Sequence, residues 1–295
     1  MYLGSTLFMD GALMSEVAIR IDPMAWLGCA LKDLENTFGE ETIWWRGHTD
    51  AINWELKPSA LRPPLKTREG IEHELIRKFR SRAIGRLGHR PIPSSELEWL
   101  MLAQHYRLPT RLLDWTENPL TALYFAVLDE PNREKSVDGC LWAISPSRLN
   151  AQFAQPGLPN SAMKRLFGAE EPTVQAMAME AFGIGDDAIV RRFPQLKPAK
   201  QKRLGLPRVL ALEAVEMDER IVAQAGRFTI HRPDRQFVGG IDRLQGHENY
   251  IREFRIPAEC KKDLRKLLVR MGIQKWNLFP DLQSLAEGLK KHHFM

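Results

Sequence analysis

The chain is poor in cysteine. It has three among 295 residues, Cys29, Cys140 and Cys260, and they stand far apart in the sequence. An odd number of scattered thiols does not form the framework of a small disulfide-stabilised secreted domain. No pair of cysteines or histidines has zinc-ligand spacing, and the adjacent His292 and His293 lie near the end of the sequence. We therefore expect reduced thiols, no bound metal and a cytoplasmic protein.

Long apolar runs are also missing. No stretch reaches the roughly 18 apolar residues of a transmembrane helix, so we expect no membrane association. The first 20 residues contain Asp10 and Glu16 and lack the apolar segment and cleavage site of a secretory signal. Internal repeats and low-complexity tracts are absent too. With 44% hydrophobic residues, the chain is nevertheless long enough and apolar enough to bury a full globular core.

The charge balance is only slightly basic. Forty-two Lys and Arg against 37 Asp and Glu give a net charge of +5, which permits anionic ligands or nucleic acid but requires neither. One segment, RRFPQLKPAKQKRLGLPR from Arg191 to Arg208, is locally very basic. Because no aromatic residue interleaves its lysines, the pattern favours a solvated linker or surface loop. A patch that binds phosphate or nucleic acid is the alternative.

Hydrophobic periodicity predicts helices and strands in a scattered order. Helical patterns run over 24–38, 71–87 (with Leu75, Phe79 and Ile84 inward), 261–271 and 280–290. Strand patterns run over ETIWWRGH, which ends at His48, and over 139–144, 208–215, 221–231 and 250–256. The segment 163–183 is too weakly patterned to assign. This order predicts an α+β fold with a single mixed or antiparallel sheet surrounded by helices. We expect a helical extension at 1–39 and one domain at 40–295, with a basic insertion around 185–208.

The central segment EWLMLAQHYRLPTRLLDWTENPLTALYFAV, residues 98–127, combines apolar helical patterns with many hydrogen-bonding side chains. Ser95, with Glu98 three residues on, predicts the start of one helix, whose stripe is Trp99, Leu102, Ala103 and Tyr106 and which ends at Pro109. Asn118 followed by Pro119 predicts the start of a second, with Leu120, Leu123, Tyr124 and Val127 buried. Between them we expect a tight polar loop from Pro109 to Glu117. Such a loop between apolar helices suits the floor of a binding site.

Several motifs of this chain resemble those of one family, the FRG domain, which is named for an aromatic-Arg-Gly motif. They are WWRGH at 44–48, the central block around TRLLDWT, DGCLWAI at 138–144, RIVAQAGRFTIH at 220–231 and MGIQKWNLFPDLQSLA at 271–286. The resemblance covers roughly residues 40 to 290. The family is mostly uncharacterised and occurs in bacteria and in phage-related contexts, so its name implies no chemistry.

The order of these motifs is also similar to that of ADP-ribosyltransferases. That similarity implies NAD as a cofactor, with Arg46 holding a phosphate or ribose, Thr110 and the strand after it scaffolding the nicotinamide pocket, and Gln224 at the place of the catalytic acid. The planar guanidinium of Arg46 suits a diphosphate. However, Gln224 is neutral where a developing positive charge needs a carboxylate, and no Ser-Thr-Ser is present. Catalysis would then depend on Asp114 or Glu117.

The resulting candidate site has two catalytic candidates, Gln224 and Asp114. The ligand-binding candidates are Arg46, Gly47, Gln104, His105, Thr110, Arg111, Trp115, Thr116 and Asn118. Each also has a structural interpretation. Arg46 can form a buried bidentate ion pair with Asp114, His105 can donate to a carbonyl, and Gln224 can be a satisfied sheet residue. The tryptophans at 44, 45 and 115 can belong to the core.

Three functions remain open on this evidence. In the first, an effector in bacterial or phage-related defence binds a nucleotide such as NAD in one cleft and transfers ADP-ribose from it. In the second, the same cleft recognises a nucleotide or another anionic small molecule without turnover. In the third, a toxin uses the segment from Arg191 to Arg208 to bring nucleic acid to the cleft.

Overall fold

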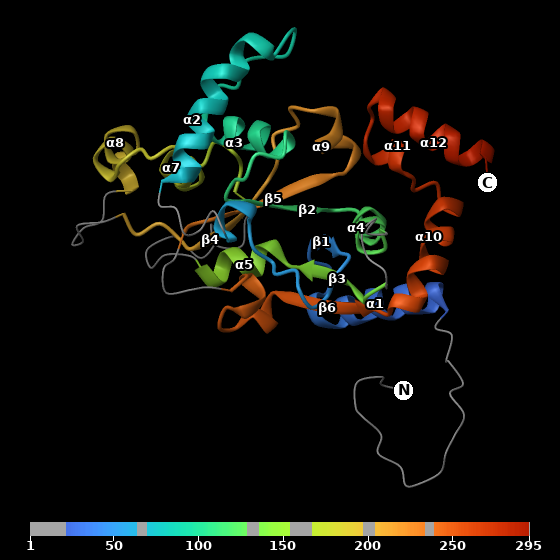
Figure 1. Cartoon of the computed structure of the whole chain (residues 1–295). Helices are drawn as coiled ribbons and strands as arrows, with labels where there is room; N and C mark the ends of the chain where they lie inside the picture. The colour runs from blue at the N-terminus through green and yellow to red at the C-terminus, as the bar shows by residue number, and fades with distance from the viewer. Residues whose placement is uncertain are drawn as a thin grey trace.

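The core of the molecule is a six-stranded antiparallel sheet with the strand order β4-β5-β2-β1-β3-β6 (Figure 1). The structure, a computed structural model, describes residues 22–63, 70–128, 136–153, 167–196, 204–233 and 239–294, without the side chains from 291 on. The strands are β1 Trp44–His48, β2 Leu112–Thr116, β3 Gly139–Ile144, β4 Val209–Leu212, β5 Gly226–His231 and β6 Ile251–Ile256. The predicted α+β class with a single sheet is therefore confirmed.

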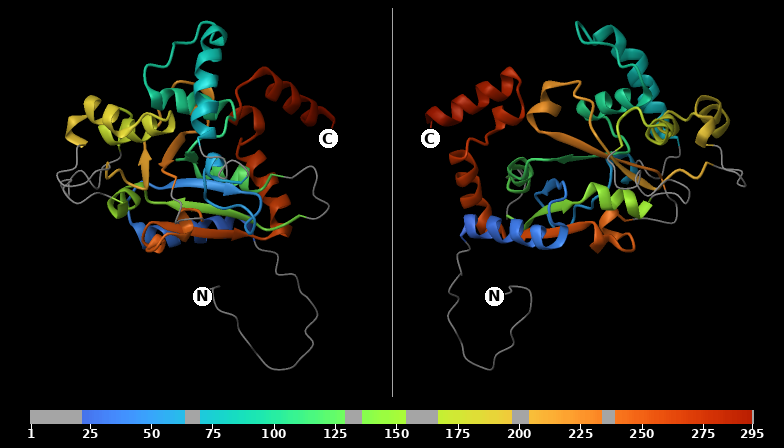
Figure 2. Two further views of the ribbon diagram at one scale, coloured as in Figure 1. Left: turned by 60° about the vertical axis from the view of Figure 1, so that its left-hand side comes forward. Right: turned by 180° about the vertical axis from the view of Figure 1, so that it is seen from behind.

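Helices surround the sheet on both faces. They are α1 Pro23–Phe38, α2 Ile71–Ala83, α3 Glu96–His105, α4 Pro119–Ala126, α5 Pro146–Phe153, α7 Pro172–Ala181, α8 Asp186–Arg192, α9 Glu219–Ala223, α10 Lys261–Arg270, α11 Lys275–Leu278 and α12 Leu282–Phe294. In all views α2, α3, α7 and α8 gather on one side of the molecule, whereas α1 lies on the opposite side beside β6 (Figures 1 and 2). Within the described chain, no helix is both long enough and apolar enough to cross a bilayer.

The buried side chains form three clusters. The first packs α2, α3 and α7 against β4, β5 and the start of β2. The second packs α1, α4 and α10 against β1, β3 and β6. The third lies on the opposite face of the sheet, where Trp44, Leu113 and Trp115 meet α5 and the short turns around Leu56 and Ile241. Two separate helical groups thus share one face of the sheet, and the space between them falls over β1 and β2.

Both helix starts in the central segment are confirmed. Ser95 accepts a hydrogen bond from the backbone N–H of Glu98 at 3.3 Å, although the Glu98 carboxylate bonds to Ser94 rather than back to Ser95. Asn118 accepts from the N–H groups of Leu120 and Thr121, and Pro119 occupies the first turn of α4. These caps satisfy N–H groups that have no partner inside the helix.

Two local predictions were wrong. The expected loop from Pro109 to Glu117 contains strand β2, in the middle of the sheet. Because β2 is covered on both faces, its sequence LLDWT lacks the polar alternation of a half-exposed strand. The expected strand at 221–226 is instead helix α9, whose first turn is capped by Asp218 through the N–H of Arg220 at 2.8 Å.

Two side-chain predictions were also wrong. Tyr106 follows the end of α3 and is 53% exposed, because α3 stops at His105, before the predicted end at Pro109. Ile84 lies beyond α2 and is 50% exposed, whereas Ile76 and the carboxylate Glu72 are buried. The unassigned segment 163–183 contains α7, which is almost entirely buried.

The structure leaves parts of two predicted segments undescribed. Of the extension at 1–39, residues 1–21 lie outside the described chain, and the rest includes α1, whose Leu34 and Phe38 pack in one cluster with Trp45. Of the basic segment, residues 197–203 lie outside it. Arg192, which is described, forms an ion pair with Glu96 at 3.0 Å. Nucleic-acid binding through Arg191 to Arg208 therefore stays a prediction.

Candidate functional site

The two central strands of the sheet barely pair. β1 and β2 meet at a single register position, Trp45 opposite Thr116, whereas β1 pairs with β3 along its whole length and β2 does the same with β5. Beyond Trp45 the strands diverge. A cavity of about 450 Å³ lies above this divergence, between α3, α4 and α9. The separation of β1 from β2 therefore creates the largest feature of the candidate site.

Gly47 sets how closely α4 approaches β1. A Cβ atom at this position would lie 1.9 Å from the Ala122 carbonyl oxygen and 2.5 Å from the Ala126 nitrogen. Both are backbone atoms of α4, so no side-chain rotation can relieve the clash. Only glycine allows this packing. The glycine of the WWRGH motif thus lines the cavity and also fixes its α4 wall.

Arg46 spans the gap between the strands. Its Nη1 donates to the Asp114 carbonyl oxygen at 2.6 Å and lies 3.7 Å from the Asp114 carboxylate, and its Nε donates to His48 Nε2 at 3.0 Å. The side chain bonds to a β2 carbonyl at the level where β1 no longer pairs with β2. Burial lowers the pKa of Arg46 and the Asp114 charge raises it, but an arginine stays protonated.

The predicted ion pair between Arg46 and Asp114 exists, but it is not buried. The Asp114 side chain is 54% exposed and the Arg46 side chain 20%. Gln104 Nε2 donates to the Asp114 carboxylate at 2.9 Å, and the Gln104 carbonyl accepts from Thr110 Oγ1 at 2.7 Å. Thr110, Gln104 and Asp114 therefore form a chain of hydrogen bonds that presents a carboxylate to the cavity.

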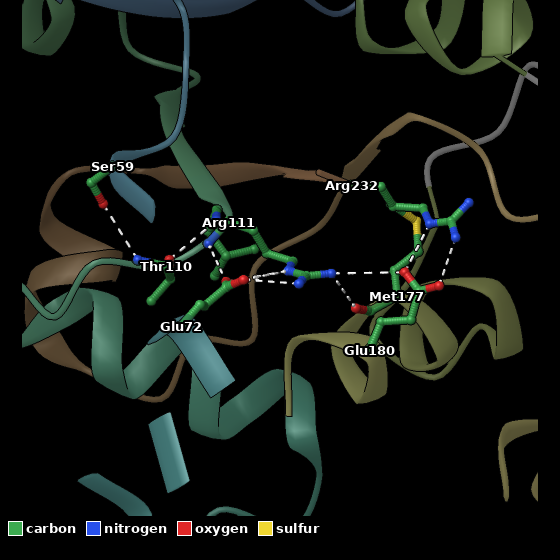
Figure 3. A network of polar contacts seen from close by, with 8 residues as sticks. Ser59, Glu72, Thr110, Arg111, Met177, Glu180 and Arg232 are labelled. Carbon is green, nitrogen blue, oxygen red and sulfur yellow. Dashed lines mark hydrogen bonds and ion pairs between the residues drawn. The ribbon is translucent and has the colours of Figure 1, made fainter. Parts of the chain in front are cut away.

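Arg111 lies away from the cavity, in a buried network of ion pairs (Figure 3). It is 1% exposed, and its Nη2 lies 2.8 Å from the Glu72 carboxylate. Its Nη1 donates to the Met177 carbonyl at 3.4 Å and lies 3.8 Å from Glu180, which also binds Arg232. This placement gives Arg111 the role of joining β2 to α2 and α7. A ligand cannot reach it without displacing those elements.

The remaining candidates divide between the cavity lining and its supports. Trp115, Thr116 and Gln224 line the cavity together with Arg46 and Asp114, so the two catalytic candidates and the arginine share one cleft. The Gln224 amide donates to the Leu278 carbonyl at 2.9 Å, and its backbone carbonyl accepts from Thr116 at 2.5 Å. Asn118 is used as the cap of α4 and Thr110 as the support of Gln104; neither lines the cavity.

The tryptophans have mixed placements. Trp44 is fully buried on the far face of the sheet. Trp45 belongs to the core cluster around α4, yet one part of it lines the cavity. Trp115 also lines it, and its indole N–H donates to Thr229 Oγ1 at 3.1 Å.

The cavity is electropositive. Four arginines line it, Arg46, Arg107, Arg220 and Arg227, against the single carboxylate of Asp114. Arg227 is neutralised by Glu117 at 3.0 Å. Among the described residues, Arg107 and Arg220 have no carboxylate within ion-pair distance, and the guanidinium of Arg220 lies over the Phe279 ring at 4.6 Å. Burial lowers the pKa of Arg220 most, the Asp114 charge raises it, the Arg107 charge lowers it, and the Asp218 and Asp281 charges raise it. Guanidinium groups without a carboxylate in direct contact are suited to an anionic ligand.

Sequence reasoning missed Arg107 and Arg220 as lining residues. Both lie inside quoted motifs, HYRLPTR and RIVAQAG, but nothing in their local sequence distinguishes them from surface arginines. For Arg107, but not for Arg220, the backbone conformation distinguishes the residue. Arg107 has φ = 62° and Ala225, between two lining residues, has φ = 46°, which are the two positive values among the described non-glycine residues. Backbone strain of this kind is common at functional sites.

Two buried histidines, His48 and His231, lie close to Arg46. Burial, with the Arg46 and Arg62 charges, lowers the pKa of His48 to about 2. Burial and the Arg46 charge lower the pKa of His231 to about 3. Both rings are therefore neutral at pH 7. For His48 this leaves Nε2 free to accept the hydrogen bond from Arg46 Nε.

Comparison with known proteins identifies one family. No curated protein and no solved structure matches the chain significantly. Residues 41–135 match the model of the FRG domain. The matched range contains β1, α3, β2 and α4, which supply Arg46, Gly47, Gln104 and Asp114 to the cavity. The chain therefore carries an FRG domain, and the cavity is lined largely by residues of the matched range.

Proposed function

We propose that this protein binds a nucleotide in the cavity between α3, α4 and α9. The observation that carries the proposal is the excess of guanidinium groups over carboxylates in the lining. A phosphate group offers several acceptor oxygens and up to two negative charges, which suits Arg107 and Arg220, because neither forms a direct ion pair with a described carboxylate. The volume of about 450 Å³ is in the usual range for small-molecule sites. Aromatic side chains of Trp45, Phe125 and Phe228 provide apolar walls for a base.

NAD is the first candidate ligand, and ADP-ribosyl transfer is the reaction that we propose for it. In such a reaction a carboxylate must oppose the positive charge that develops on the ribose. Asp114 supplies an exposed carboxylate beside Arg46, whereas Gln224 is neutral and its amide N–H is already used by Leu278. We therefore assign charge stabilisation to Asp114 and, to Gln224, contact with a ribose hydroxyl. An effector role in bacterial or phage-related defence is part of this proposal and follows from the FRG resemblance.

A recognition module without turnover is the second candidate. It is favoured by the two groups that already contact the Asp114 carboxylate. Gln104 donates to it at 2.9 Å and Arg46 Nη1 lies 3.7 Å away, and both reduce the negative charge available to a cation. In this alternative the cavity holds the same nucleotide through the same arginines, and no product forms.

Calorimetric titration with NAD, ADP-ribose and ATP tests the proposed binding. Replacing Arg107 or Arg220 by alanine removes a charge-assisted hydrogen bond, which is worth about 1.5–3 kcal/mol, so we expect affinity to fall roughly 10- to 100-fold. Arg82→Ala is the matched control, because Arg82 is exposed on α2 and away from the cavity. Equal affinities for all four proteins, or no binding of any of the three nucleotides, would overturn the proposal. Measuring the release of free nicotinamide from NAD then distinguishes an enzyme, which releases it, from a recognition module, which does not.

A further inference from the structure

A histidine and an aspartate meet at the edge of the cavity. His105 is the last residue of α3, lines the cavity and has a side chain that is 15% exposed. Its Nδ1 lies 3.3 Å from Asp218 Oδ1, and the Asp218 side chain is only 8% exposed. Among the described residues, nothing is within hydrogen-bond distance of the other ring nitrogen, Nε2. The pair thus has one nitrogen next to a shielded carboxylate and one nitrogen without a partner.

Asp218 is held in place by two further contacts. Its Oδ1 accepts from the Arg220 N–H at 2.8 Å as the cap of α9, and its Oδ2 accepts from Arg90 Nη1 at 3.0 Å. Arg90 also donates to the Tyr106 hydroxyl at 3.0 Å, and the Tyr106 ring meets the His105 ring edge to face at 4.8 Å. The imidazole is therefore flanked by the Asp218 carboxylate and by the Tyr106 ring.

The surroundings of His105 favour its neutral form. Burial lowers its pKa most, the Asp218 charge raises it, and the charges of Arg220 and Arg90 lower it. Neutral imidazole carries one proton, and the nearby carboxylate favours that proton on Nδ1. The lone pair of Nε2 is then available to accept a proton. This arrangement, in which a carboxylate orients the base, is that of histidine general bases.

We propose that His105 is the general base of a hydrolytic reaction in the cavity and that Asp218 is its positioning residue. The substrate class is a nucleotide with an N-glycosidic bond to a good leaving group. This inference rests on the proposed function, because the arginines must first hold the nucleotide. It adds that water is the acceptor of the ribosyl group and that a side chain of the cavity activates this water.

The reaction of NAD shows how the groups would act together. A water oxygen forms a bond to C1′ of the nicotinamide ribose, and His105 Nε2 takes the water proton. The bond between C1′ and the nicotinamide nitrogen breaks, and its electron pair neutralises the charge on the pyridinium ring. Asp218 stays ionised and stabilises the imidazolium, which returns its proton to solvent. The products are ADP-ribose, nicotinamide and one proton.

The carboxylate of Asp114 favours a glycosidic bond over a phosphate ester. A carboxylate in the cavity attracts the positive charge that develops on a ribose carbon. The same carboxylate would repel the negative oxygens of a phosphoryl group under attack. Asp114 and His105 line the same cavity, so both groups are on the surface that a bound nucleotide would contact.

The experiment uses the full chain with NAD as the probe. Nicotinamide and ADP-ribose are quantified by chromatography from pH 4.5 to 9, and NAD affinity is measured by calorimetry on the same preparations. The variants are His105→Gln and Asp218→Asn, which keeps an oxygen acceptor for the cap of α9. The control is His89→Gln, because His89 is an exposed histidine outside the cavity.

We expect His105→Gln to bind NAD within about threefold of the wild type and to release nicotinamide at least 100-fold more slowly, as loss of a general base does. Because the Asp218 charge raises the pKa of His105, Asp218→Asn should shift the acid limb of the pH–rate profile to lower pH and reduce the plateau. A structural role alone would move neither limb.

The outcomes separate this inference from the proposed function. NAD binding without any nicotinamide release by the wild type would overturn the hydrolytic inference and leave the nucleotide site standing. Release by His105→Gln at the wild-type rate would overturn it as well. No binding of NAD would remove both the inference and NAD as the ligand.

Discussion

The buried ion pair between Arg111 and Glu72 yields a quantitative prediction about stability. The Glu72 carboxylate contacts Arg111 at three points: the backbone N–H at 3.0 Å, Nε at 3.2 Å and Nη2 at 2.8 Å. Glu72→Ala would leave a guanidinium that is 1% exposed without its main partner. Breaking a buried pair from one side costs about 3–5 kcal/mol.

The remaining contacts of Arg111 set where in this range the variant should fall. Nη1 keeps the Met177 carbonyl at 3.4 Å and lies 3.8 Å from Glu180, so part of the charge stays compensated. We therefore expect a loss of about 3 kcal/mol in the free energy of unfolding. In a chain of this size about 1 kcal/mol shifts Tm by roughly 2–4 °C, which predicts a fall of roughly 6–12 °C.

Urea unfolding followed by tryptophan fluorescence measures this loss, with Glu74→Ala as the control. Glu74 is on the same helix, but its side chain is 51% exposed where it pairs with Lys78, and such pairs contribute less than about 1 kcal/mol. The double variant Glu72→Leu with Arg111→Met should recover most of the loss, because apolar residues can replace a buried pair. A cost below about 1 kcal/mol for Glu72→Ala would refute the reasoning. So would a stable Arg111→Met variant that no longer binds nucleotide.

Three further predictions concern the cavity and its surroundings. Gly47→Ala should lower the free energy of unfolding in urea by about 3 kcal/mol, because the new Cβ would clash with the α4 backbone. The control Gly28→Ala in α1, where a Cβ would meet nothing within 4 Å, should raise it by about 0.5–1 kcal/mol. Equal effects of the two variants would contradict the packing role of Gly47. Arg107→Gly should raise Tm by relieving its positive φ while it weakens nucleotide binding, and a lower Tm would argue against strain. The His231 imidazole has a pKa of about 3 in the folded protein, so its contribution to stability is fully present above pH 6.5 and is lost as the pH falls toward 3. His231→Asn should therefore reduce the slope of unfolding free energy against pH in that range by about 1.4 kcal/mol per pH unit. An unchanged slope would show that another group titrates there.

Local signals predicted some elements well. Asn118 with Pro119 marked the start of α4, and Ser95 marked that of α3, because a cap acts on N–H groups two or three residues away. The α+β class and the single sheet were also predictable from the scattered order of the patterns. Strand β2 was not, because its neighbours β1 and β5 come from residues far along the chain.

The sequence left open whether Arg46, Asp114 and Gln224 share one cleft. In the structure all three line one cavity. Arg111 stands three residues before the lining strand residue Asp114, but its partner Glu72 is 39 positions away. Asp218 could not be connected with His105, because the chain between them contains three strands and several helices. Long-range partners decide which polar residues are structural, and a local pattern does not contain them.

The single register position between β1 and β2 has a mechanical consequence. Hydrogen-bonded ladders normally make a sheet one stiff plate. Here β4, β5 and β2 form one plate and β1, β3 and β6 form another, joined at Trp45 and Thr116 and by the side chain of Arg46. Backbone pairing therefore links the two halves at one position only, and the cavity lies beside that position. An occupant of the cavity would contact strands of both halves, Arg46 on β1 and Asp114 on β2.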